Sequence, residues 1–335
     1  MHSVKKLDKS RIEIEGELSA EDFGKYRERA VKNIGARVDI DGFRKGLAPE
    51  HVLISKVGEM TVLEEMAELA LGELYPSIVT GEKLDVIGAP EIAITKIGKG
   101  SALGFKITST ILPELTLPNY KRIAAEVMAG ASAIEVTDAD VETTLTEIRK
   151  QRAPLKDEKG DPVLPELTNE FAKSLGDFQG LDDLRKKLKE NLGEEKKFRA
   201  KEKKRLDILE RLAAETKADI PELLVNAESE KMLSRLRGDL ERVGLKFDDY
   251  LKNVGKTEDD IRGGWKGEAE KRAKIELILL KIAEIENIKP TEEELEKEVK
   301  HVLEHYKDAK EERVRDYVAS VIQNEKVLEF LEQQT

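Results

Sequence analysis

The sequence predicts an α+β N-terminal domain, built of antiparallel strands with helices, followed by an elongated and mostly α-helical C-terminal domain. Two observations lead to this prediction. Strictly alternating apolar residues, typical of half-buried strands, occur in the first third of the 335-residue chain. Beyond residue 168, apolar residues recur instead at the three- and four-residue spacing of helices.

Composition supports an extended protein. Charged residues make up 38% of the chain and aromatic residues 4%, which is more charge and less core-forming material than an average globular domain has. The absence of cysteine excludes disulfides and thiolate metal sites. The first 18 residues are charged throughout, and no apolar run reaches membrane-spanning length. We therefore expect a soluble, cytoplasmic protein without a membrane partner.

The first domain is expected to comprise residues 1–112. Arg11–Leu18 alternates and predicts a strand, and Ser19 can cap a helix over residues 20–36. A second long helix is expected over residues 61–79. Residues 91–97 and 103–111 alternate again, and the glycine-rich stretch 98–101 between them predicts a hairpin turn. A phosphate loop is a poor alternative there because no helix follows.

An extended linker is expected over residues 113–132, because it carries prolines and little periodicity, and a helical domain over residues 133–335. One long helix is expected over residues 181–217, although its middle is almost entirely charged. Thr137, Pro221, Thr257 and Thr291 stand where later helices should begin. The apolar block 275–285 is the expected core of this half.

The most distinctive stretch is Gly42-Phe43-Arg44-Lys45-Gly46, with Pro49 three residues further on. The two glycines free the backbone for positive φ, as a tight loop requires. An aromatic ring beside two cations would suit docking on a phosphate-rich or acidic surface. The alternative is an ordinary surface turn whose Phe43 is tucked under its own domain.

The charge around this stretch differs from that of the whole chain. The net charge of −11 argues against general affinity for nucleic acids. Between Lys25 and Lys45, however, seven basic residues stand against three acidic ones. This predicts a local basic patch, with ordinary solvated helix charges as the alternative for residues 25–32.

The Gly-Phe-Arg-Lys-Gly stretch with its proline resembles the ribosome-docking signature of the trigger factor family of bacterial chaperones. Residues 37–41, 88–90, 136–140 and 164–168 are also similar to that family. Leu47 departs from the pattern, because the family commonly has a lysine there, and this weakens the electrostatic part of docking. The ribosome-binding residues that the resemblance implies are Gly42, Phe43, Arg44, Lys45, Gly46 and Pro49.

This resemblance implies an ATP-independent chaperone that docks at the ribosomal exit site and shields nascent polypeptides. Its partners would be a large-subunit protein and rRNA near the tunnel exit, together with unfolded nascent chains. Whether the free protein forms a homodimer stays open. The alternative function is a helical scaffold, or a periplasmic-type chaperone that does not bind ribosomes.

Members of this family normally carry a prolyl-isomerase domain between the helix expected to end near Arg152 and Pro165. Here only the short, charged loop 153–164 occupies that place, and a domain needs about 50 residues. We therefore expect no isomerase module and no enzymatic activity.

A chaperone without nucleotide chemistry must hold its clients on exposed apolar side chains. The candidates in the helical half are Met232, Leu236, Leu240, Phe247 and Tyr250. Methionine suits varied partners because it is flexible and polarisable. The alternative is that these side chains pack the helices together.

One further pattern suggests metal chemistry. His301 and His305 flank Glu304 in an H-x-x-E-H arrangement, which some zinc peptidases use. A zinc site needs a third ligand and a pocket, whereas lysines and glutamates surround this helix. We therefore expect a solvated helix there, with no metal, no cofactor and no catalytic residues.

Overall fold

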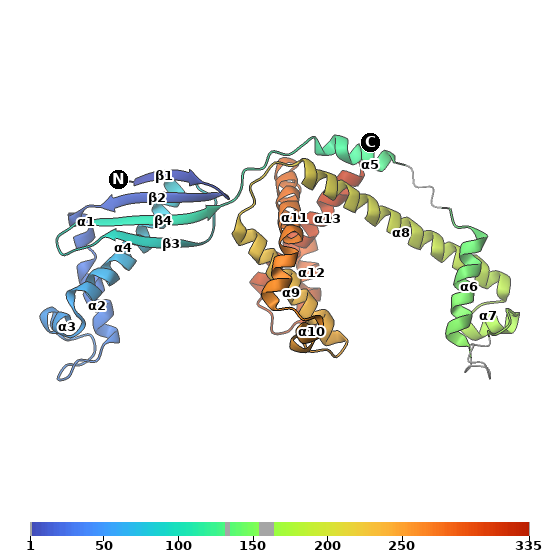
Figure 1. Ribbon diagram of the computed structural model, residues 1–335, viewed down its shortest axis with the longest axis horizontal. Helices are drawn as coiled ribbons and strands as arrows, with labels where there is room; N and C mark the ends of the chain where they lie inside the picture. Colours follow the sequence, from blue (N-terminus) through green and yellow to red (C-terminus); the bar gives the residue numbers. More distant parts are fainter. Residues whose placement is uncertain (1, 131–134, 154–163, 335) are drawn as a thin grey trace. The chain divides into compact units, whose positions relative to one another are not determined.

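The computed structural model describes residues 2–130, 135–153 and 164–334 (Figure 1). The chain divides into two compact units. Unit 1 consists of residues 1–116 and 217–277, and unit 2 of residues 117–216 and 278–335. The chain therefore crosses between the units three times, and neither unit is one continuous segment.

Four antiparallel strands form the sheet of unit 1 in the order β1-β2-β4-β3 (Figure 1). They are β1 (His2–Leu7), β2 (Arg11–Leu18), β3 (Val86–Lys96) and β4 (Leu103–Ile111). The predicted strand at 11–18 and the hairpin at 91–111 are confirmed. Strand β1 was not predicted, because its sequence is dominated by polar residues; it is held by pairing with β2, with Val4 opposite Ile14.

Helices α1 (Ala20–Gly24), α2 (Arg27–Arg37), α3 (Glu50–Val57) and α4 (Glu59–Gly81) cover one face of this sheet. Alternate residues of β2 and β4 point into the shared core, including Ile14, Phe105 and Ile107. Ser19 caps α1 as expected, since its side chain accepts a hydrogen bond from the Asp22 amide. The single helix expected over 20–36 is wrong: it breaks after Gly24, a residue that weakens helices.

Strand β3 lies at the edge of the sheet, and the helices leave its apolar row uncovered. Ile92 pairs with Ile107, and Ile94 with Phe105, so all four side chains belong to one face. Ile107 and Phe105 are fully buried, whereas Ile92 and Ile94 are 47% and 41% exposed. An alternating pattern therefore reveals which residues share a face, and the neighbouring helices decide which of them are buried.

The rest of unit 1 is helical. It contains α9 (Glu222–Arg242), α10 (Phe247–Val254) and α11 (Glu258–Ile285) as far as Leu277. Helices α9 and α11 share a small core that includes Val225, Ala269 and Ala273. Helix α9 begins directly after Pro221, as predicted, because proline suits the start of a helix.

Unit 2 corrects the linker prediction. Residues 113–132 were expected to be extended, yet α5 (Tyr120–Ala129) is a helix. Asn119 caps it by accepting a hydrogen bond from the Arg122 amide, and Ile123 and Ala124 are completely buried. Tertiary burial therefore stabilises a helix that is too short to form alone.

The remaining helices of unit 2 are α6 (Asp138–Arg152), α7 (Asn169–Leu175), α8 (Leu181–Glu215), α12 (Glu292–His305) and α13 (Glu311–Glu332). Capping boxes at Thr137 and Thr291 begin α6 and α12, as predicted. The charged middle of α8 is helical, so the expected long helix is confirmed. Within the described residues, no helix is both long and apolar enough to cross a membrane.

Candidate docking loop and client-binding surface

The loop between α2 and α3, residues 38–49, is anchored at its base and open at its tip. Val38 and Ile40 are half-buried and pack against the core of the sheet and helices. The Gly46 amide donates a hydrogen bond of 2.9 Å to the carbonyl of Gly35 in α2. The loop is therefore tied to the helix that precedes it.

Both glycines of the motif adopt the conformation that the sequence predicts. Gly42 has φ +84° and Gly46 has φ +80°, a region that other residues rarely adopt. Pro49 is the N-cap residue of α3, one position earlier than a first helical residue. The loop residues thus bend the chain sharply twice and place residues 43–45 between the bends.

The side chains at the tip reach solvent. Phe43 is 43% exposed and Leu47 is 70% exposed, so Phe43 is not tucked fully under its own domain. Lys45 forms an ion pair of 3.2 Å with Asp39, whereas Arg44 has no charged partner among the described residues. The tip therefore presents two apolar side chains beside one free guanidinium group.

The predicted basic patch is much smaller in the structure, because helices α3 and α4 supply carboxylates to its arginines. Arg27 binds Glu50 and Glu59 at 2.8 and 2.6 Å. Arg29 pairs with Glu73 and Arg37 with Glu65. These bonds raise the pKa of Arg27, the bond to Glu59 contributing most. Three cations that the sequence assigned to the patch are thus already neutralised.

The helical client candidates divide into buried and partly exposed residues. Leu240 is only 8% exposed, so it belongs to the packing of α9 and offers little surface to a client. Met232 is half-buried against the core shared by α9 and α11, and Leu236 is also half-buried. Phe247 and Tyr250 are half-buried on α10, where the Arg237 guanidinium lies 4.7 Å from the Phe247 ring centroid.

More exposed apolar residues lie at the turn between α9 and α10 and at the end of α10. Val243 is 70%, Leu245 48% and Val254 42% exposed. Gly244 between the first two has φ +74°, and the Leu245 amide donates to the carbonyl of Leu240. Sequence reasoning missed these residues, although apolar residues flanking a helix-ending glycine, as Val243 and Leu245 do, are an available signal, since turns are usually polar.

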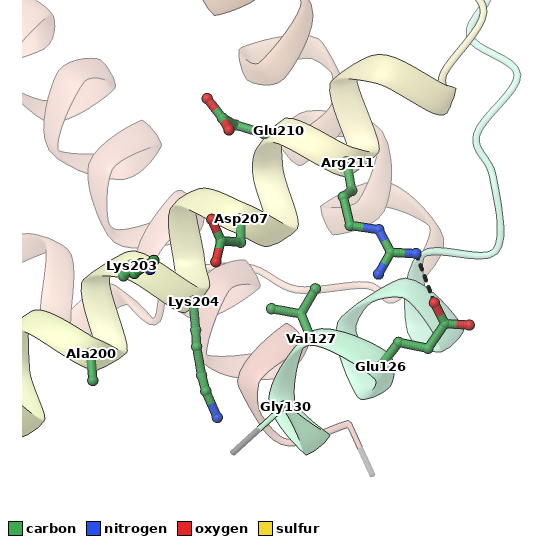
Figure 2. Close-up of a pocket in the computed structure, with 9 residues that line it drawn as sticks. All are labelled: Glu126, Val127, Gly130, Ala200, Lys203, Lys204, Asp207, Glu210 and Arg211. Carbon is green, nitrogen blue, oxygen red and sulfur yellow. Dashed lines mark hydrogen bonds and ion pairs between the residues drawn. The ribbon is translucent and has the colours of Figure 1, made fainter. Parts of the chain in front are cut away.

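Two other features are the histidine pair of α12 and a cavity beside α8. His301 and His305 lie one turn apart on α12 with ring centroids at 4.9 Å, and the described residues contain no group of three His, Cys, Asp or Glu side chains that could hold a metal. An open cavity of about 470 Å³ is lined by residues of α5 and α8. Figure 2 shows Arg211 of α8 reaching toward Glu126 of α5, with which it forms an ion pair of 2.7 Å. Lys204, also in its lining, donates to the Met128 carbonyl at the end of α5. These bonds hold the two helices together.

Comparison with known proteins identifies the family. A family model described as bacterial trigger factor protein matches residues 1–148, and a second, for the C-terminus of bacterial trigger factor protein, matches residues 180–333. Together the two models include nearly the whole chain. The chain belongs to the trigger factor family.

Curated relatives agree with this assignment. The trigger factors of Caldanaerobacter subterraneus and Caldicellulosiruptor bescii are each 26% identical to this chain, over 96% and 98% of its length and 93% and 95% of their own. A solved structure of a trigger factor chaperone, studied for promiscuous substrate recognition in folding and assembly, covers 99% of both chains with a TM-score of 0.56. At 21% identity, that likeness supports the fold.

The same comparisons bear on the missing module. Residues 149–179, between the two matched segments, are too few for a domain of about 50 residues. The alignment to the Caldicellulosiruptor trigger factor is 416 positions long, so this relative has residues without a counterpart in a chain of 335. This trigger factor therefore lacks the region of a prolyl-isomerase domain. Residues 154–163 of the expected loop lie outside the described residues.

Proposed function

We propose that this trigger factor is a cytoplasmic, ATP-independent chaperone that docks at the ribosomal exit site and holds unfolded nascent polypeptides. The observation that carries the proposal is the loop 38–49, which is anchored at its base and presents Phe43, Arg44 and Leu47 to solvent. An exposed apolar side chain on a conformationally fixed loop favours binding, because little order is lost on docking.

The charges of the loop define the kind of partner surface. Residues 38–49 contain two acidic and two basic residues, and the arginines of α2 are paired with glutamates. Apolar contact and one guanidinium group should therefore supply most of the affinity. We expect the loop to touch a large-subunit protein, with rRNA phosphates contributing less, and we expect added salt to weaken docking only modestly.

Cosedimentation with purified ribosomes tests this proposal. Replacing Phe43, Arg44 and Lys45 together by alanine should reduce ribosome pelleting at least tenfold, while the circular dichroism spectrum stays unchanged because these three residues lie at the exposed tip of the loop and not in the core. Lys32→Ala, an exposed residue of α2 outside the loop, is the matched control and should pellet normally. Undiminished pelleting of the triple variant would contradict the proposal.

For the client side, we propose a surface centred on Val243, Leu245 and Val254, with Phe247 and Tyr250 at its edge. The exposure of these side chains supports this choice over Leu240. Each offers part of an apolar side chain, and burial contributes about 25 cal/mol per Å² before the costs of ordering the client. Client binding should therefore be weak and quickly reversible.

Suppression of aggregation of an unfolded client, without ATP or ribosomes, tests this surface. The variant Val243→Ser, Leu245→Ser, Val254→Ser should suppress aggregation less effectively than the unaltered chain at an unchanged melting temperature. Met60→Ser, which changes a similarly exposed side chain on α4, is the control. A large fall in melting temperature of the triple variant would show instead that these residues are core.

We also propose that the chain does not catalyse prolyl isomerisation, since the region of that module is missing. Uncatalysed isomerisation is slow, so a coupled peptide assay detects any catalyst easily. The isomerisation rate should be independent of the concentration of purified protein, and a rate that rises with that concentration would contradict this part of the proposal.

A further inference from the structure

The turn between β1 and β2 has an unusual backbone. Lys9 has φ +60° and Ser10 has φ +53°, although neither is a glycine. Consecutive residues in this region are typical of tight turns between antiparallel strands, although they cost non-glycine residues some strain. The contacts of this turn show what holds it.

The turn binds the segment that leads into α9. The Lys9 amide donates to Asp219 Oδ2 at 2.5 Å, and Ser10 Oγ donates to the Asp219 carbonyl at 2.7 Å. Lys9 Nζ lies 2.9 Å from Glu222 Oε1, which Lys266 Nζ also approaches at 3.2 Å. These two lysines lower the pKa of Glu222, Lys9 contributing most, and so keep its carboxylate ionised.

A second contact lies at the start of β3. Gly88 has φ +72°, and a Cβ atom added there would lie only 2.7 Å from Leu223 Cδ2. No side chain fits at that distance unless Leu223 moves. The first turn of α9 therefore packs directly on the backbone of β3.

A third contact follows β4. Thr116 and Lys217 exchange backbone hydrogen bonds of 3.0 and 3.3 Å, and Leu115 packs against the small core of α9 and α11. We call residues 2–116, which hold the sheet and helices α1 to α4, the α+β part. Three separate segments of it, at residues 9–10, 88 and 115–116, thus meet residues 217–223. We call this set of contacts the hairpin junction.

We propose that the hairpin junction is a rigid connection between the α+β part and the first turn of α9, so that the loop 38–49 and helix α9 move as one body. Neither the family assignment nor the proposed docking requires this rigidity. Much of the junction is exposed and made of ion pairs and hydrogen bonds, so it can be opened by single substitutions without disturbing either hydrophobic core. Its test is a distance within unit 1, which is independent of ribosome binding.

The absence of cysteine allows site-specific spin labels, placed at the exposed positions Lys56→Cys in α3 and Arg235→Cys in α9. Double electron–electron resonance should give one narrow distance distribution for the otherwise unaltered chain. The double variant Asp219→Ala, Glu222→Ala should broaden it at least twofold. Asp239→Ala, which breaks an exposed ion pair of α9 with Arg242, is the control and should leave it narrow. A broad distribution in the unaltered junction, or an unchanged one in the double variant, would overturn the proposal.

The packing contact has its own test. Gly88→Ala should broaden the distribution even with the polar contacts intact, because its methyl group displaces Leu223. Leu223→Ala alone removes the packing atoms and leaves residue 88 unchanged, so it should broaden the distribution as well. If Leu223→Ala leaves the distribution narrow, the contact with Leu223 does not hold the junction.

Discussion

The α+β part and the end of unit 2 around α6, α7 and α8 differ in how they bury apolar side chains. The α+β part gathers its buried residues into one continuous core between the sheet and four helices. In the described part of the other region, the core has four buried residues with half-buried neighbours around them. A continuous core resists local opening, whereas a small one depends on helix caps and surface ion pairs. If the proposed function is correct, the docking loop 38–49 belongs to the region with the continuous core.

The largest expected effect comes from the continuous core. Phe105→Ala removes a side chain that is 1% exposed and should lower the free energy of unfolding by about 3–5 kcal/mol. Ile94→Ala is the matched control, because Ile94 pairs with Phe105 across the strands yet is 41% exposed; it should cost less than about 1 kcal/mol. Urea unfolding followed by circular dichroism measures both. Equal effects would remove the distinction between the covered and uncovered strands.

The small core of unit 2 should respond more locally. Leu184→Ala empties a site that is 2% exposed and should cost about 2–4 kcal/mol. Amide hydrogen exchange should accelerate in α6 and α7 while β2 and β4 keep their protection. Phe198→Ala, on the same helix but 65% exposed, should change little. If Leu184→Ala also exposed the sheet to exchange, the two cores would not be independent.

A smaller effect is expected from the ion pairs that join α8 to α13. Arg205, which is 11% exposed, binds Glu332 at 2.5 Å and Glu325 at 2.6 Å. Arg205→Met leaves both carboxylates without this partner and should cost about 1–3 kcal/mol in thermal or urea unfolding. Arg199→Met breaks only an exposed pair with Glu195 within α8, so it should cost less than about 0.5 kcal/mol. A similar loss from both variants would contradict the special role of Arg205.

The smallest expected effect is a pH dependence of the capping boxes. Lys196 and the Thr137 amide lower the pKa of Asp140 to about 2, and Lys326 with the Thr291 amide does the same for Glu294. Because both pKa values lie below their ordinary values of 3.8 and 4.5, these carboxylates stabilise the fold at neutral pH. That contribution should disappear as the pH falls from about 4.5 to 2.

Hydrogen exchange of α6 between pH 5 and pH 2 measures the effect of Asp140. Asp140→Asn should make the protection of α6 less dependent on pH in this range. Glu147→Gln replaces an exposed carboxylate of the same helix outside the capping box and should leave the pH dependence unchanged. An identical profile for Asp140→Asn and the unaltered chain would contradict this prediction.

Sequence reasoning correctly predicted the features of the structure that depend only on neighbouring residues in the chain. The capping residues Ser19, Thr137 and Thr291 and the two glycines of the loop carry their own geometry in the sequence. Strand β1 and helix α5 could not be predicted in this way, because they form through a partner strand and through tertiary burial.

The same limit applies to the candidate sites. Leu240 and Val243 are three residues apart on the same apolar pattern, yet one is 8% and the other 70% exposed. Only the neighbouring elements decide this difference. The arginines of α2 fail as a basic patch for a similar reason, because the glutamates that neutralise them lie at least 23 residues away in sequence.

Helix α8 also fixes the distance between two packed regions of unit 2. Leu184 belongs to the small core with α6 and α7, and Ile208 is buried in the segment of α8 that packs near α5. At about 1.5 Å per residue, the unbroken helix holds these two positions about 36 Å apart. No side chain reaches across that distance, so the packing around Leu184 and the packing around Ile208 cannot share contacts. The two ends of α8 are therefore stabilised by separate sets of neighbours, joined only by the helix itself.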